Sequence, residues 1–328
     1  MRFVVCVALL GALACSSPKT GSEVRIAVGG QSQLVYLPTT LARQLGEYEK
    51  YNLRVTLTDF QGGAKALEAL LGGSADVVSG FFDHVIQMHA EGRKVRAFVA
   101  MQRFPGLAVV VSPATKKQIR TIADLKGAIV GVSAPGSSTD LLLKYLLSRN
   151  GVPASEVSFT GIGMSAAAVA AMERGKVDAA VMADPAITIL AQRARILRIL
   201  ADTRTEEGVK QVFGTSQYPA AVLYATDAWL SSHPSEALAL AKAMQNTLRY
   251  LQSNPKEAAA KMPPEFQGDD RALYAETVRA ALPMYSPSGE MPADGPATLM
   301  KVLGVSLDKV RNARIDPGAT YTNQWVTQ

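Results

Sequence analysis

Short apolar runs alternate with segments of helical spacing along the first third of this 328-residue chain. The apolar runs predict buried strands, and segments in which apolar residues recur every three or four positions predict helices. Strands are expected at residues 24–28, 53–57, 76–78, 95–100 and 107–111, and helices at 36–45, 66–71 and 82–90. Short strands alternating with helices are typical of the α/β class with a parallel sheet.

The same order returns in the second part of the chain. Strands are expected at 129–132, 157–160, 179–182 and 196–201, and helices at 141–147, 166–172 and 187–194. A further strand at 220–225 precedes a mostly helical tail, with helices at 237–251, 255–261, 271–282 and 297–302. We therefore expect one lobe from 23–112 and 215–328 and another from 113–214, with crossings near 111–114 and 214–218.

A faint internal repeat supports two similar lobes. Residues Gly63-Ala-Lys-Ala66-Leu-Glu-Ala69 lead to Gly73-Ser-Ala-Asp76, and Ser165-Ala-Ala-Ala168-Val-Ala-Ala171 leads to Gly175-Lys-Val-Asp178. Alanines, glycine and aspartate keep the same offsets in both. One such match carries little weight by itself, because alanine-rich helices that stop at glycine are common.

The N-terminus predicts export. One arginine and an apolar run shorter than the roughly 18 residues of a membrane span indicate a signal peptide at 1–14. Its end, Leu13-Ala14-Cys15, resembles a lipoprotein signal, so Cys15 is expected to carry lipid and 15–22 to form a polar tether. Plain secretion is the alternative. Because Cys6 would leave with the signal, the mature chain is expected to hold no disulfide.

Composition limits the function classes. The chain is 48% hydrophobic and 6% aromatic, and its net charge of +6 is not gathered into a basic run, so nucleic-acid binding is not expected. Walker, dinucleotide-glycine and His-Glu-x-x-His motifs are absent, and three histidines show no metal-ligand spacing. Residues Gly131-Val-Ser133-Ala-Pro135 carry proline where a nucleophile elbow needs glycine. We expect no catalytic residues, no metal and no cofactor.

Polar residues instead gather after the strands of the first lobe. They are Gln31, Ser32 and Gln33 after the first strand, Gly62 and Gly63 after the second, and Phe81, Asp83 and His84 after the third. Open α/β sheets bind ligands at these strand ends. Each has a structural alternative as turn, helix cap or core, and a lone histidine such as His84 is expected to face solvent. Together they predict one side of a cleft.

The stretch 130–143 predicts the other side. A Pro135-Gly136 turn is followed by Ser137, Ser138 and Thr139 just before a leucine-rich helix. These hydroxyls are typical helix caps. The free N–H groups and positive dipole of the same helix start can also hold an anion.

Three further residues are candidates for the cleft. Asp184, followed by Pro185, can cap a helix or contact ligand. Met164 and Phe104 can form apolar walls or fill the core.

Several short motifs together resemble a known family. They are Ile122-Ala-Asp124-Leu-Lys126-Gly127, the strand into Gly136-Ser-Ser138, and Gly175-Lys-Val-Asp178-Ala with Asp184-Pro185. This set is similar to periplasmic substrate-binding proteins of nitrate/sulfonate/taurine-type ABC importers, which include relatives of the thiamine-pyrimidine synthesis family. The resemblance implies a bilobal type II fold with two crossing hinge strands. It also implies a monomer in the periplasm or at the cell surface, held to the membrane only by lipid, whose partner is a permease with its ATPase.

The resemblance further implies ligand contacts. In sulfonate binders the Gly-Ser-Ser turn holds the anion. The resemblance implies the same role here for Gly136, Ser137 and Ser138, with Thr139 beside them. Asp140 stands where histidine is common in those proteins, and Ala183 where an aromatic residue is common. A small organic anion, whether sulfonate, taurine-like or carboxylate, is the first expectation. A pyrimidine or other aromatic heterocycle, stacked on Phe81, Phe82 or Phe104 and bonded to Asp83 or Asp184, is the second, and a secreted enzyme on the same fold the third.

The lipoprotein signal gives a first testable prediction. Replacing Cys15→Ser removes the thiol that would be acylated, so the protein should leave the membrane fraction and appear in the soluble fraction. Fractionation followed by immunoblotting measures this. Persistent membrane association of the variant would contradict lipid attachment at Cys15.

Overall fold

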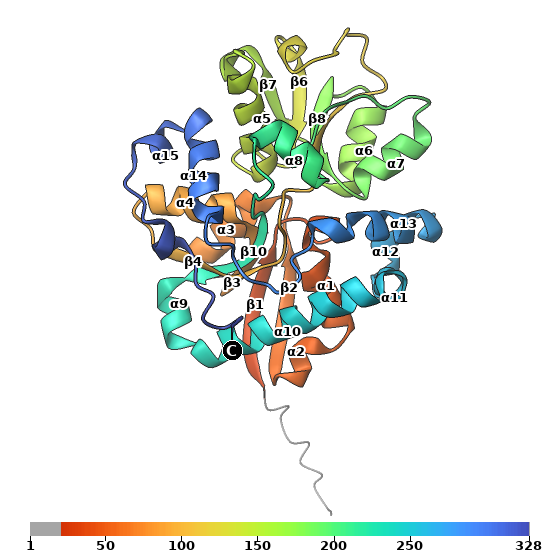
Figure 1. Ribbon diagram of the computed structural model, residues 1–328. Helices are drawn as coiled ribbons and strands as arrows, with labels where there is room; N and C mark the ends of the chain where they lie inside the picture. Colours follow the sequence, from red (N-terminus) through yellow and green to blue (C-terminus); the bar gives the residue numbers. More distant parts are fainter. Residues whose placement is uncertain (1–20, 328) are drawn as a thin grey trace, which may run out of the picture.

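A computed structural model describes residues 21–327 of the chain as two lobes, each built on its own sheet (Figure 1). The predicted signal peptide and Cys15 lie outside the described residues. The first sheet has the order β2-β1-β3-β10-β4. Its strands are β1 (Ser22–Val28), β2 (Leu53–Asp59), β3 (Val77–Phe81), β4 (Val95–Ala100) and β10 (Ala221–Thr226).

The second sheet repeats this arrangement in the order β7-β6-β8-β5-β9. Its strands are β5 (Leu107–Val111), β6 (Ile129–Val132), β7 (Ser158–Gly161), β8 (Ala179–Ala183) and β9 (Ile199–Asp202). In each sheet four strands run in the same direction, and one strand, β10 or β5, is antiparallel to both of its neighbours. The parallel core of each sheet was predicted. The antiparallel strands β5 and β10 are the ones that follow a crossing between lobes.

The position of β5 corrects one sequence-based boundary. This strand pairs with β8 and β9, so the chain leaves the first lobe between Ala100 and Leu107 rather than near 111–114. Residues 107–111 are apolar throughout and fully buried, which suits the interior of either sheet, and the pattern therefore does not say which sheet they join. The chain returns between Phe213 and Ala221.

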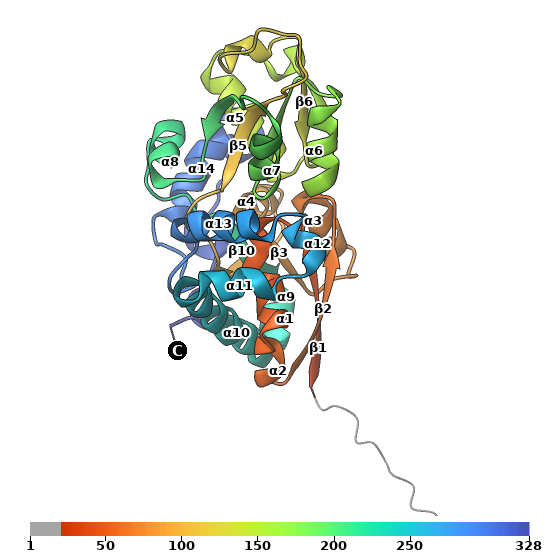
Figure 2. The same ribbon diagram turned by 90° about the vertical axis from the view of Figure 1, so that its right-hand side faces the viewer.

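Helices cover both faces of each sheet (Figure 2). The first lobe contains α1 (Leu37–Gln44), α2 (Glu47–Lys50), α3 (Gly63–Leu71) and α4 (Phe82–Ala90), and the second contains α5 (Ser138–Arg149), α6 (Ser165–Glu173), α7 (Ala186–Arg193) and α8 (Glu206–Phe213). The tail adds α9 (Asp227–Ser232), α10 (Pro234–Ser253), α11 (Pro255–Lys261), α12 (Pro264–Gln267), α13 (Arg271–Ala281), α14 (Gly295–Ser306) and α15 (Asp308–Asn312). Over residues 21–327, no helix is both long and apolar enough to cross a bilayer.

The repeated aspartate has the same structural role in both lobes. Asp76 accepts a hydrogen bond from the backbone N–H of Arg25 at 2.8 Å, and Asp178 accepts one from the N–H of Ile129 at 2.9 Å. Each also pairs with a cation, Arg25 in the first lobe and Lys117 in the second. The aspartate of the internal repeat therefore links β1 to the start of β3 in the first sheet, and β6 to the start of β8 in the second.

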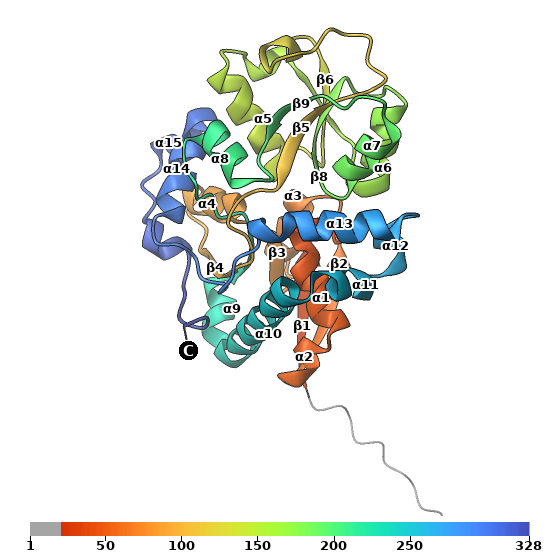
Figure 3. The same cartoon turned by 45° about the vertical axis from the view of Figure 1, so that its right-hand side comes forward.

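The C-terminal tail joins the lobes instead of belonging to the first alone. Helix α10 packs on α1 and α2, whereas α14 packs on both α4 of the first lobe and α5 of the second (Figure 3). Leu299, Val302 and Leu303 of α14 are buried in the core cluster that also contains the leucines of α5. The lobes thus share apolar packing on this side.

This packing predicts a stability cost. Leu303→Ala should lower the free energy of unfolding by about 2–5 kcal/mol because it leaves a cavity in the shared core. Lys301→Ala, on the exposed face of the same helix, should change it by less than about 0.5 kcal/mol. Urea unfolding followed by circular dichroism measures both, and equal effects of the two changes would contradict the packing described.

Candidate functional site

The two sheets point their strand ends at each other, and a small cavity lies where the lobes meet. Its volume is about 20 Å³, room for about one water molecule. The lining contains no charged side chain and consists of Gly29, Val35, Tyr36, Gly63, Phe81, Leu107, Ser133, Ser137, Ser138, Thr139 and Met164. The lobes are therefore closed on one another.

Hydrogen bonds cross the cleft directly. The N–H of Ala64 donates to Ser137 Oγ at 3.1 Å, and Ser138 Oγ donates to Asp83 Oδ1 at 3.0 Å. His84 Nε2 lies 3.3 Å from the carbonyl oxygen of Gly136. The predicted residues of the two lobes, 83–84 and 136–138, are thus brought together.

Glycine at position 62 permits this close approach. Its φ of +127° favours glycine, and a Cβ there would lie 2.8 Å from Ser137 Oγ and 2.9 Å from Ser133 Oγ. A Cβ on Gly63 would lie 2.6 Å from the ring of His84. The two glycines predicted for the site therefore allow close packing, of Gly62 against the second lobe and of Gly63 against His84, because neither carries a side chain.

The start of α5 leaves backbone donors free. The Ser137 side chain makes no capping bond to its own helix, because its hydroxyl binds the first lobe instead. Thr139 Oγ1 accepts from the N–H of Ser133 at 2.9 Å and so fixes the turn. The N–H groups of Ser138 and Thr139 have no hydrogen-bond partner among the described residues.

Asp140 does not leave a free negative charge at this helix start. Its Oδ2 accepts from the N–H of Gly136 at 2.8 Å and pairs with Lys144 Nζ at 2.8 Å. Lys144 thus compensates the charge of the carboxylate that lies beside the predicted anion site.

Asp83 and His84 form a buried pair on the other side of the cleft. Asp83 is 3% exposed and His84 1% exposed, with Asp83 Oδ1 3.5 Å from His84 Nδ1. Burial raises the pKa of the Asp83 carboxyl above its ordinary value, although the neighbouring His84 and the Ser138 hydroxyl act to lower it. The expectation that His84 faces solvent was wrong, because α4 begins inside the contact between the lobes.

Aromatic side chains complete the first-lobe wall. Phe81 lies edge-on to Tyr36, with ring centroids 5.9 Å apart. Burial raises the pKa of the Tyr36 hydroxyl, and the nearby Asp83 adds to that rise. Phe82 and Phe104, by contrast, are fully buried core residues outside the cavity lining, which corrects the prediction of Phe104 as a wall.

The loop after β1 contacts the second lobe through polar side chains. Gln33 Nε2 donates to Ser165 Oγ at 2.6 Å, and Ser32 Oγ also hydrogen-bonds that oxygen. The N–H of Gln31 donates to Asp59 Oδ1 at 2.6 Å, while its buried Nε2 has no partner among the described residues. Met164, beside Ser165, lines the cavity as predicted.

The Asp184 side chain does not line the inner cavity; it bonds the first turn of α7 and pairs with Arg204. Its Oδ1 accepts from the N–H and the hydroxyl of Thr188, and its Oδ2 pairs with Arg204 at 3.1 Å. The capping alternative therefore describes this side chain. Its carbonyl oxygen accepts from the N–H of Leu34 at 2.8 Å and adds one more link between the lobes.

Three residues with hydroxyl groups at the site were not predicted, nor were Gly29, Val35 and Leu107 of the cavity lining. Tyr36 falls within an expected helix, and the sequence gives no signal that its ring turns to the cleft. Ser133 and Ser165 stand inside motifs that were read for other features, a failed nucleophile elbow and a repeat. Ser133 directly follows a predicted strand, and Ser165 directly precedes a predicted helix. These positions at the ends of elements could have identified both residues.

Two mixed sheets of matching order, joined by two connecting segments and closed over a small cavity, define the bilobal fold of periplasmic binding proteins. The connections, residues 101–106 and 214–220, are not the crossing strands that were expected. A solved protein from Bordetella bronchiseptica RB50 shares this fold at a TM-score of 0.90 and 37% identity over 95% of this chain and 98% of that one. Residues 33–258 match the NMT1/THI5-like family, and the chain belongs to that family.

Two other proteins extend the comparison. The alkanesulfonate-binding protein of Xanthomonas axonopodis pv. citri, solved with MOPS bound, shares the fold at a TM-score of 0.70 and 19% identity, covering 94% of this chain and all (100%) of that one. A putative aliphatic sulfonates-binding protein of Escherichia coli K12 is 30% identical over 188 residues, 56% of this chain. The match spans 58% of that relative's length, which is less than two thirds.

The raised pKa of Asp83 predicts a pH dependence. Because the folded state holds the Asp83 proton more tightly than the unfolded state does, ionisation costs stability as pH rises from the ordinary aspartate pKa of about 3.9. In Asp83→Asn this cost is absent. The free energy of unfolding of the variant, minus that of the wild type, should therefore increase from pH 4 towards neutrality. Urea titrations across this range measure it, and a difference that does not change with pH would contradict the shift.

Proposed function

We propose that this protein is the solute-binding component of an ABC importer. It captures a small organic anion, of sulfonate, taurine-like or carboxylate type, between its lobes and delivers it to a permease with its ATPase, without a chemical step. The family, the bilobal fold and the name of the Escherichia coli relative support this assignment.

The observation that carries the proposal is the start of α5 at the cavity. A 12-residue helix presents two free N–H groups there, together with the hydroxyls of Ser133, Ser137, Ser138 and Thr139. Free N–H groups and the positive end of a helix dipole favour an anion. Such donors recognise a charged oxygen group without a positively charged side chain.

The shifted pKa of Asp83 bears on an anionic ligand. An ionised carboxylate in this place would repel the anion, and because burial raises the pKa of Asp83, protonating this carboxyl when an anion binds costs less than it would in water. A protonated carboxyl can donate a hydrogen bond to a ligand oxygen. The bound anion would then replace Asp83 as the partner of the Ser138 hydroxyl.

Binding requires the lobes to open and close. A cavity of about 20 Å³ admits no organic molecule, so entry must break the bonds that Ser137, Ser138 and Ser165 make across the cleft. Hinge closure around a ligand would then replace these bonds and exclude water.

A second candidate ligand is a pyrimidine or other aromatic heterocycle. Tyr36 and Phe81 offer ring surfaces beside the cavity, and Asp83 can bond a ring nitrogen. This arrangement favours a planar neutral molecule over nitrate or a small sulfonate if the carboxyl, rather than the helix start, dominates recognition.

We also propose export to the periplasm or cell surface with lipid on Cys15 as the membrane attachment, and a monomeric state. The signal-like N-terminus of the sequence supports export and lipid attachment, and the resemblance to the binding-protein family supports the monomer.

A ligand screen tests the proposed class. Thermal-shift and calorimetric titrations with methanesulfonate, taurine, nitrate, acetate and a hydroxymethylpyrimidine should show binding by a sulfonate or carboxylate, since a ligand held only by the native state raises its stability. Ser138→Ala should weaken the anion about ten-fold or more, because a hydrogen bond to a charged group contributes roughly 1.5–3 kcal/mol.

Ser155→Ala, on the exposed surface, is the matched control and should bind as the wild type does. Binding of the pyrimidine alone would move the assignment to the heterocycle. Anion affinity that survives Ser138→Ala would remove the α5 start from the site.

A further inference from the structure

The end of the second lobe that points away from the cleft carries a cluster of cations. Strands β6 and β8 begin at this end, and the loop between β5 and β6 lies there in Figure 1. Three loops surround the strand starts, at residues 114–120, 174–176 and 195–198. They contain seven lysines and arginines, all exposed, and no acidic residue. We call this set the basic patch, and it consists of Lys116, Lys117, Arg120, Arg174, Lys176, Arg195 and Arg198.

Contacts join the three loops into one surface. Arg198 Nη1 donates to the carbonyl oxygen of Ile119 at 2.7 Å. Lys117 Nζ pairs at 2.8 Å with Asp178, which lies between the loop of residues 174–176 and β8. The fold therefore gathers cations that the sequence keeps in three separate groups, and for this reason the linear sequence shows no basic run.

Most of the patch has no acidic partner. In the part of the chain that the structure describes, no ion pair or hydrogen bond holds the side chains of four of the seven cations, Lys116, Arg174, Lys176 and Arg195. By contrast, Lys117 is paired with Asp178, and a carboxylate oxygen of Asp124 accepts from the N–H of Arg120 at 2.9 Å. The surface potential at this end is therefore positive.

Helix dipoles account for only part of this charge. Arg174 and Arg195 follow the C-termini of α6 and α7, where cations are favourable. The effect falls off within the last turn of a helix, and it gives no reason for Lys116, which lies on a loop that follows a strand.

Exposed apolar side chains lie at the same end. Ile196 is 78% exposed and stands between Arg195 and Arg198, while Ile129 and Ile199, at the starts of β6 and β9, are 41% and 36% exposed. Over residues 21–327, the other large apolar side chain exposed to this degree is Leu71 of the first lobe. Single exposed apolar residues are common, but three at one basic end indicate an interaction site.

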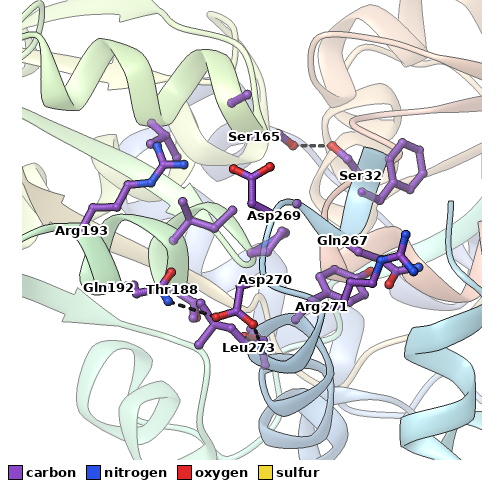
Figure 4. Close-up of a pocket in the computed structure, with 18 of the residues that line it drawn as sticks. Ser32, Ser165, Thr188, Gln192, Arg193, Gln267, Asp269, Asp270, Arg271 and Leu273 are labelled. Carbon is purple, nitrogen blue, oxygen red and sulfur yellow. Dashed lines mark hydrogen bonds between the residues drawn. The ribbon is translucent and has the colours of Figure 1, made fainter. Parts of the chain in front are cut away.

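The patch is distinct from the pocket between the lobes. Arg193, at the end of α7, lines that pocket and pairs with Glu173 at 3.5 Å (Figure 4). The acidic side chains of Asp269 and Asp270 line the same pocket from the segment before α13. Arg193 therefore belongs to the pocket wall and is not counted in the patch.

We propose that the basic patch binds the anionic surface of a lipid bilayer. The cations meet lipid phosphates, and Ile196 enters the headgroup region. Apolar residues flanked by lysine and arginine are typical of interfacial membrane contacts, and each cation near an anionic leaflet adds to the attraction. A headgroup layer needs no fixed partner geometry, which suits cations that are not held by neighbouring side chains. The inference is independent of the ligand proposed for the cleft.

Vesicle binding tests the proposal. The protein is the Cys15→Ser variant taken from the soluble fraction, so that no attached lipid contributes. It should co-sediment with vesicles of phosphatidylcholine mixed with phosphatidylglycerol and not with vesicles of phosphatidylcholine alone. Raising the salt concentration to about 0.5 M should release it, because salt screens attraction between exposed charges.

A triple variant and a matched control locate the binding surface. Replacing one cation from each loop should weaken vesicle binding about ten- to hundred-fold, since each contributes roughly five-fold; the changes are Lys116→Ser, Arg174→Ser and Arg195→Ser. The control removes three exposed lysines outside the patch and should bind as the parent does; its changes are Lys256→Ser, Lys261→Ser and Lys301→Ser. Both triple variants should keep the parent melting temperature, because all six positions are exposed.

Ile196 reports insertion. Ile196→Ser should weaken vesicle binding about three-fold or more, because less apolar surface leaves water. In Ile196→Trp, the fluorescence emission should shift to shorter wavelength when anionic vesicles are added. The parent protein, which contains Trp229 and Trp325, gives the background signal.

The outcomes that overturn the proposal are distinct. Absence of binding to the anionic vesicles refutes it, and so does equal binding by the patch variant and the control variant. Polyglutamate serves as a soluble acidic probe. If the patch binds polyglutamate while vesicles leave the Ile196→Trp emission unchanged, the partner is an acidic protein and the membrane proposal falls. None of these results changes the ligand proposed for the cleft.

Discussion

The buried contact between Asp83 and Ser138 is the constraint on which the cleft depends. It places a carboxyl group of one lobe against the electropositive helix start of the other, beside a cavity of about 20 Å³. Burial raises the pKa of this carboxyl above its ordinary value. A ligand with charged oxygens has to compete with Asp83 for the Ser138 hydroxyl. The lobes can therefore close with a carboxyl oxygen of Asp83 at this hydroxyl or with a ligand oxygen in its place.

Most of the architecture followed from the pattern of apolar residues. The strands and the longer helices were predicted with small shifts at their ends, because each alternates cleanly with its turn residues. The short helices α2, α8 and α9 were not predicted. The strand expected at 196–201 begins only at Ile199, and Ile196 is 78% exposed. The lobe of β5 could not be predicted, since a fully buried run fits either sheet. Helix α8 was not predicted, although Val209, Val212 and Phe213 recur at helical spacing and Thr205 caps its start.

The site was predictable by position but not by contact. Strand ends placed residues 83–84 and 136–138 at facing edges of the two sheets, and the structure bonds them to each other. Residues 32 and 33 instead contact the second lobe at Ser165. Which partner each hydroxyl chooses depends on the distance between lobes, which no local pattern encodes. Ser137 was thus expected to cap its helix or bind ligand and instead binds the first lobe. For the same reason Phe104, expected as a possible wall of the cleft, lies in the core, whereas Tyr36, which was not predicted, lines the cavity.

The position of β1 has a mechanical consequence. This strand begins at the end of the first lobe farthest from the second, as Figure 1 shows. An attachment upstream of Ser22 would therefore hold the first lobe as the stationary half of the molecule. The second lobe, which carries the free helix start, would be the half that swings, and neither the mouth of the cleft nor the arc of that motion would be obstructed by the tether.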